Sequence, residues 1–129
     1  MDVLIKYGFT IEEIKNIMDS NQEFDMIDDD KIYKLIDLLG TIGCLSNHIK
    51  NIFITNPFIF NNELDDIKKI IDFLNSINLN NLYIMFDTNP FLFNVSYNEV
   101  KKIYNKLKNN GLSDDEIKNY FYYELKEVI

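Results

Sequence analysis

The chain has 129 residues, which fits one domain, and 47% of them are apolar, too large a share for a disordered segment. Its net charge of −8 has the wrong sign for a surface that attracts nucleic acid everywhere. The single cysteine, Cys44, excludes an internal disulfide and a cysteine-rich zinc site. No stretch approaches the ~20 apolar residues that span a bilayer.

The amino terminus gives no sign of a targeting segment. Residues 1–6 read MDVLIK, too short and too acidic for a signal or transit peptide. We therefore expect a cytoplasmic protein that contacts no membrane. Every positive charge is a lysine, because the chain lacks arginine, and lysine cannot form the bidentate fork with which arginine binds phosphate or guanine.

Capping motifs and apolar periodicity predict a succession of helices. After a helix end within residues 1–7, three capping boxes mark helix starts, at Thr10-x-x-Glu13, Ser96-x-x-Glu99 and Ser113-x-x-Glu116. Asp28 and Asn62 are expected to cap two further helices. Apolar residues recur at helical spacing over residues 11–18, 32–39, 49–53, 64–74, 82–86 and 100–107. A last helix is expected from about Asp114 to Lys126, with Ile117, Tyr120, Phe121 and Val128 toward the core.

Two phrases recur along the chain. TNPFIFN at 55–61 returns 33 positions later as TNPFLFN at 88–94, and GFTIEEIKN at 8–16 matches GLSDDEIKN at 111–119, about three periods of 34 residues away. Paired helices that repeat at a fixed interval bury their apolar faces by stacking on neighbours. The predicted fold is therefore an all-α, short α-solenoid (superhelix) of about three two-helix repeats and a terminal half repeat. Residues 1–129 form one domain, with units at about 8–43, 44–77 and 78–110 and a half unit at 111–129.

Several residues are assigned structural roles. Pro57 and Pro90 each precede a short apolar run, which we predict to be a 3₁₀ or extended link that tucks aromatic rings such as Phe58 and Phe91 into the core. Gly8 and Gly111 open the first unit and the last half unit.

These phrases resemble the repeats of the mitochondrial transcription termination factor (mTERF) family. In that family Gly-Leu-Ser opens a unit, as Gly111-Leu112-Ser113 does here, and a proline followed by apolar residues closes its first helix, as in Phe86-x-x-x-Pro90-Phe91-Leu92-Phe93 and Phe53-x-x-x-Pro57. The first unit has Asn21-Gln22 where the others have Asn-Pro. The resemblance covers nearly the whole chain. It implies a curved stack of helical pairs in a left-handed superhelix, which binds nucleic acid along a basic groove in transcription or RNA metabolism.

Two sets of residues are candidate binding surfaces. Lysines at equivalent repeat positions form two columns, Lys15, Lys50 and Lys118, and Lys34, Lys69 and Lys102. Such columns form either a basic strip or an ordinary solvated face whose lysines pair with nearby acidic residues. Tyr120, Tyr122 and Tyr123 place aromatics around the last helix, where they either cap the stack or meet a partner.

Catalytic and metal chemistry find no support in the pattern. Cys44 and His48 are two ligands at most, and no orienting group for a nucleophile accompanies them. The acidic run at 28–30 lacks the alternation and glycine of a calcium loop, and four scattered glycines form no phosphate-binding loop. We expect no enzyme activity, no cofactor, no bound metal and no small-molecule substrate.

The leading hypothesis from sequence is a non-catalytic repeat module that binds another protein in a regulatory or inhibitory role. One variant is an acidic inhibitor whose carboxylates take the place of phosphates on a nucleic-acid-binding protein. The alternative is mTERF-like binding of DNA or RNA. A structural, self-assembling role is third.

Overall fold

The computed structural model of the protein describes residues 2–79 and 81–124. This part of the chain contains eight α-helices, three 3₁₀ segments and one π-helical segment, and no β-strand. The elements in chain order are α1 (Asp2–Tyr7), α2 (Ile11–Ser20), η1 (Phe24–Met26), α3 (Asp29–Thr41), α4 (Ser46–Thr55), η2 (Pro57–Asn61), α5 (Leu64–Ser76), α6 (Leu82–Thr88), η3 (Pro90–Asn94), α7 (Tyr97–Asn109), α8 (Asp114–Asn119) and the π-helical η4 (Tyr120–Glu124). None of these helices has both the length and the apolar character that crossing a bilayer requires.

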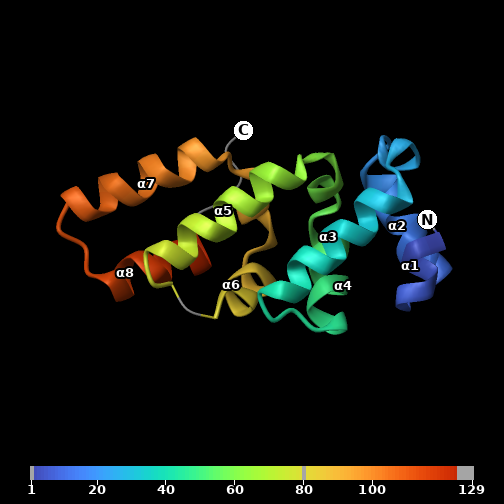
Figure 1. Ribbon diagram of the computed structural model, residues 1–129, viewed down its shortest axis with the longest axis horizontal. Helices are drawn as coiled ribbons and strands as arrows, with labels where there is room; N and C mark the ends of the chain where they lie inside the picture. The colour runs from blue at the N-terminus through green and yellow to red at the C-terminus, as the bar shows by residue number, and fades with distance from the viewer. Residues whose placement is uncertain (1, 80, 125–129) are drawn as a thin grey trace.

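The helices form two rows along the long axis of the molecule (Figure 1). One row contains α1, α3, α5 and α7, each packed against the next, and the other contains α2, α4, α6 and the α8–η4 pair. A unit therefore consists of a first helix, a 3₁₀ segment and a second helix, and it packs on the following unit in both rows. The fold is the all-α solenoid that the repeated phrases predict.

The turn from each second helix into the next first helix is the same in all four places. The residue in this turn has a positive φ, which is +108° at Gly8, +97° at Gly43, +64° at Asn78 and +83° at Gly111. The next backbone N–H then donates to a leucine carbonyl five residues earlier, as from Cys44 to Leu39 at 3.2 Å. This Schellman turn satisfies carbonyls at the end of the helix, and it explains why glycine recurs at this point of the repeat.

Helix starts follow the capping boxes at Thr10 and Ser113, whose hydroxyls accept from the N–H groups of Glu13 and Glu116. At the start of α4 no side-chain oxygen is available, and the Nδ1 atom of His48 accepts a hydrogen bond from the N–H of Leu45 at 2.9 Å. The expected cap at Asn62 was wrong. Glu63 precedes α5, and the Asn62 side chain instead donates to the carbonyl of Phe93 at 2.7 Å, across the boundary between units.

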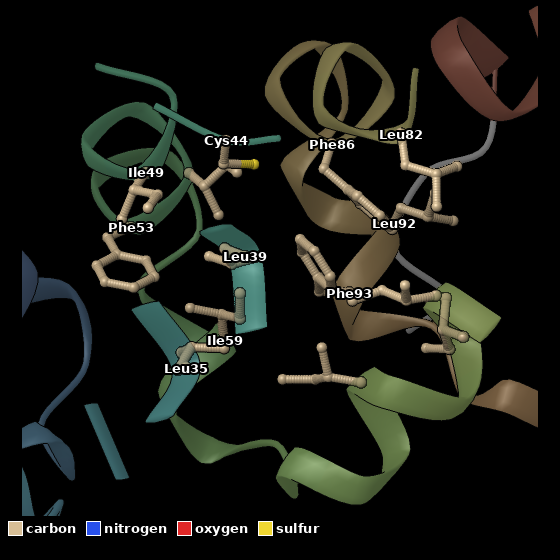
Figure 2. Close-up of a cluster of buried hydrophobic side chains, with 14 of the residues drawn as sticks. Leu35, Leu39, Cys44, Ile49, Phe53, Ile59, Leu82, Phe86, Leu92 and Phe93 are labelled. Atoms are coloured by element: carbon tan, nitrogen blue, oxygen red, sulfur yellow. The ribbon is translucent and has the colours of Figure 1, made fainter. Parts of the chain in front are cut away.

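The core is one continuous cluster between the two rows. Figure 2 shows Leu35 and Leu39 of α3 on the same side of the core as Phe53 of α4, and Phe86 of α6 beside Phe93 of η3 one unit later. The last two rings stack at 4.0 Å between centroids. Phe53 and Phe60 form the equivalent ring pair of the preceding unit. Each fully buried apolar side chain of this size contributes about 1.5–3 kcal/mol relative to an exposed one.

The two Asn-Pro phrases form 3₁₀ helices, as the short proline-led runs predict. With three residues per turn, Pro57 and Phe60 share the inward face, and so do their counterparts one unit later. Phe58 and Phe91, which we expected in the core, instead remain 47% and 37% exposed. That expectation was wrong because the tight 3₁₀ turn directs the second residue of each phrase outward.

A row of buried asparagines joins successive units. Asn21, Asn56 and Asn89 each follow a first helix and are 2%, 0% and 7% exposed. Their Nδ2 atoms donate to backbone carbonyls of the following unit, at Pro57 (3.0 Å), Pro90 (3.0 Å) and Phe121 (2.9 Å). Asn56 and Asn94 also exchange amide hydrogen bonds of 3.0 and 2.8 Å. Because a buried polar group is costly unless it is paired, these bonds fix the register of one unit on the next.

The carboxyl-terminal helix changes type along its described length. The α-helical part ends at Asn119, and residues Tyr120–Glu124 continue as a π-helical turn. Phe121 and Tyr122 of this turn are buried, and Phe121 supplies the carbonyl that Asn89 binds. The predicted end at Lys126, and Val128, lie outside the described residues.

Candidate nucleic-acid interface

The second helices carry one of the predicted lysine columns. Lys34, Lys69 and Lys102 occupy equivalent exposed positions on α3, α5 and α7, each two residues after a buried core residue. Lys34 Nζ lies 3.0 Å from the Asp30 carboxylate one turn earlier, in an exposed ion pair. Asp65 holds the same place before Lys69 on α5, whereas Asn98 holds it before Lys102 on α7.

Charge therefore differs sharply between neighbouring second helices. α3 and α5 each contain two lysines and three aspartates. α7 contains four lysines, at 101, 102, 106 and 108, against a single carboxylate, Glu99. Asparagines at 98, 105 and 109 add neutral amides to the exposed face of the same helix. In a chain of net charge −8, α7 is a local surface of positive charge.

Aromatic rings alternate with lysines along α7. Tyr97, Lys101, Tyr104 and Lys108 follow one another at spacings of four, three and four residues, so they share one helix face. Lys101 Nζ lies 4.4 Å from the centre of the Tyr97 ring. Both tyrosine rings also meet Phe73 of α5 nearly edge-on, at 6.1 and 5.6 Å, which fixes their positions at the junction of α5 and α7. We call Tyr97, Lys101, Lys102, Tyr104, Lys106 and Lys108 the α7 surface.

The ion pair at the end of α7 affects one of these lysines. Lys108 Nζ binds the Asp114 carboxylate at 3.0 Å, and this hydrogen bond raises the pKa of Lys108. The lysine is therefore fully charged at neutral pH. No salt bridge occurs at Lys102 or Lys106 among the described residues.

The other lysine column is less open. Lys50 Nζ lies 3.8 Å from the Glu13 carboxylate and 5.6 Å from the centre of the Phe9 ring. Lys118 lies over the Tyr122 ring at 5.8 Å, and of the three lysines in this column only Lys15 is exposed. On α6 the equivalent position holds Tyr83, so the column is interrupted between its second and last members.

The three tyrosines of the last turn take different environments. Tyr122 is buried, and burial raises its pKa, while Tyr120 is partly buried against Phe121. Tyr123 is 68% exposed and borders a hollow of about 470 Å³ that Ile84 and Lys118 also line.

Cys44 and His48 take structural places. Cys44 is buried between α4 and α6 (Figure 2), and burial raises the pKa of its thiol to about 12, far from that of a nucleophilic thiolate. Nδ1 of His48 accepts the backbone hydrogen bond at the start of α4, and its ring lies 5.4 Å from that of Tyr83. No group of three His, Cys, Asp or Glu side chains among the described residues is placed to hold a metal ion.

The sequence pattern missed two groups. Of the buried asparagines, Asn56 and Asn89 belong to the repeated Asn-Pro phrase and Asn21 holds the same place in the first unit, and only this identical place in three units could have indicated a common contact. Lys106 and Lys108 lie outside both columns, because the preceding unit has Phe73 and Asn75 in their places on α5. Comparing the net charge of equivalent helices, rather than of single positions, would have singled out α7.

The molecule is thus a helical-repeat protein of the α-solenoid class, with helix–3₁₀–helix units locked by asparagines and a basic second helix in the last complete unit. The family model for mTERF matches residues 1–123, and the chain belongs to this family. No curated protein and no solved structure matches it.

Proposed function

We propose that this protein is a non-catalytic nucleic-acid-binding module whose α7 surface contacts the phosphate backbone. The observation that carries the proposal is the concentration of four lysines against one carboxylate on α7, within a chain of net charge −8. Lysines that neutralise phosphates release condensed counterions, and this release supplies most of the affinity of non-specific binding. Membership of the mTERF family, whose helical repeats bind nucleic acid, supports the same reading.

The rest of the surface restricts where nucleic acid would lie. α7 packs against α5, which carries three aspartates, and against α8, which begins with Asp114, Asp115 and Glu116. Phosphates are repelled from these carboxylates, so the contact is confined to a narrow track along α7.

A titration of labelled DNA and RNA, followed by fluorescence anisotropy at ~50 mM salt, tests the proposal, with binding expected in the micromolar range or tighter. Replacing Lys102 and Lys106 by Gln should weaken binding by about tenfold. The matched control replaces Lys15 and Lys34 by Gln, which changes the net charge equally but leaves α7 intact, and it should stay within about twofold. An equal loss in both double variants, or no binding by the wild type, contradicts the proposal.

Protein binding, the leading hypothesis from sequence, is a second candidate at a different place. The exposed ring of Tyr123 beside the hollow lined by Ile84 and Lys118 supports it, because exposed aromatic side chains next to apolar ones are typical of interface centres. If a captured partner contacts this surface, Tyr123→Ser should release it and leave the nucleic-acid titration unchanged.

A further inference from the structure

Resting on the proposed nucleic-acid function, we propose that the ligand of the α7 surface is single-stranded RNA, whose bases stack on Tyr104 and Tyr97. A duplex keeps its bases stacked inside, where surface aromatic rings cannot reach them, whereas a single strand exposes them. The α7 surface combines the two elements of single-strand recognition, since rings alternate with positive charges along one face of the helix.

Packing against Phe73 holds the Tyr97 and Tyr104 rings in place before a base binds. Both tyrosines are partly buried and meet the Phe73 ring at interplanar angles of 76° and 82°. A ring held in place before binding loses little conformational freedom when a base stacks on it. Lys101 already lies over one face of Tyr97, so Tyr104 is the principal stacking ring and Tyr97 the second.

The size of the positive surface also favours a single strand. α7 has 13 residues, which at 1.5 Å per residue is about 20 Å of helix. A rigid duplex that extends beyond α7 would continue over the carboxylates of α5 and α8, whereas a flexible single strand can bend away from them. The absence of arginine removes the bidentate contact to guanine that reads a duplex through its major groove.

The neighbouring amides favour RNA over DNA. Asn98, Asn105 and Asn109 are exposed on α7 beside the lysines. An asparagine amide both donates and accepts hydrogen bonds, and so does the ribose 2′-hydroxyl, the group by which a protein distinguishes RNA from DNA.

The experiment compares three labelled probes of one mixed sequence of 10 nucleotides, namely single-stranded RNA, single-stranded DNA and duplex RNA, on the full chain. Single-stranded RNA should bind at least about fivefold tighter than the other two. Tyr104→Leu should weaken the single-stranded RNA complex by at least about fivefold, whereas Tyr104→Phe, which keeps the ring, should remain within about twofold. Asn105→Ala should reduce the preference for RNA over DNA. Circular dichroism and the thermal midpoint establish that each variant is folded.

The outcomes separate this inference from the function on which it rests. If none of the three probes binds the wild-type chain, the proposed nucleic-acid function fails. If binding occurs but the duplex binds as tightly as the single strand, or folded Tyr104→Leu binds like the wild type, the single-strand inference alone is overturned. Equal affinity for DNA and RNA single strands overturns the choice of RNA.

Discussion

The buried asparagine between the second and third units offers the sharpest test of how the solenoid is held together. Asn56 is fully buried, donates to the Pro90 carbonyl and exchanges two hydrogen bonds with Asn94. Replacing it by Ala removes three hydrogen bonds and leaves their partners unpaired. At roughly 1 kcal/mol each, the loss is about 3 kcal/mol, a large part of the ~5–15 kcal/mol that stabilises a domain of this size.

Urea denaturation followed by circular dichroism measures this loss. With a slope of about 1.5 kcal/mol/M, the midpoint of Asn56→Ala should fall by about 2 M. Asn56→Asp has nearly the same shape but cannot donate when ionised, so at pH 7 it should be at least as destabilised. The control is Asn105→Ala on the exposed face of α7, which should change stability by less than about 0.5 kcal/mol. If Asn56→Ala unfolds at the midpoint of this control, the asparagines do not join the units.

Three further predictions follow from local geometry. Gly111→Ala should lower the free energy of unfolding by about 1 kcal/mol, because only the positive φ is strained there. Gly43→Ala should lower it by about 2 kcal/mol or more, since its Cβ would also lie 3.2 Å from the Tyr83 ring. Thermal unfolding measures both losses, and equal losses would contradict the described turn. The Cys44 thiol, with a pKa of about 12, should react with a disulfide reagent at pH 8 at least about 100-fold more slowly in the native state than in urea, and similar rates would contradict its burial. The hydrogen bond from the Thr10 backbone N–H lowers the pKa of Glu13, so the ionised Glu13 carboxylate stabilises the fold above the ordinary pKa of 4.5 and loses this effect as the pH falls through the lowered pKa. The thermal midpoint of Glu13→Gln should therefore approach that of the wild type in acid. A difference that stays constant with pH would contradict the capping bond.

Local signals in the sequence were sufficient to predict the helices. In the capping boxes at Thr10 and Ser113 both hydrogen-bonding residues lie within a stretch of four residues, so this short stretch determines the helix start. The 33-residue return of the Asn-Pro phrase likewise predicted units of equal structure. The family resemblance carried by these phrases is confirmed by the match over residues 1–123.

Contacts between units could not be predicted in the same way. Asn62 is of a residue type that often caps helices, yet its side-chain amide donates a hydrogen bond to the Phe93 carbonyl 31 residues away. Whether an asparagine caps its own helix or binds the next unit depends on how closely the two units approach, which no local pattern encodes. Phe58 was misplaced for a related reason, because a 3₁₀ helix and an extended link direct its side chain to opposite sides.

The candidate site was partly visible beforehand. The predicted column of Lys34, Lys69 and Lys102 includes one residue of α7, but the prediction made no distinction among the three lysines. The difference between them lies one helical turn earlier, since Lys34 is paired with Asp30 whereas Lys102 has Asn98 at the corresponding place, and a comparison of whole helices would have revealed it. Tyr104 lies within the predicted apolar run over 100–107, and the structure shows that it is only partly buried, against Phe73.

The proposed function depends most on α7 being the surface that contacts nucleic acid. The most direct measurement is an NMR titration of the ¹⁵N-labelled chain with a short single-stranded RNA, in which every backbone amide reports separately. Amide shifts should be largest along Tyr97–Asn109, smaller on α5 and α8, and negligible on α2. Shifts that are centred on α2 or α3, or a spectrum that the RNA leaves unchanged, would contradict the assignment of function to α7.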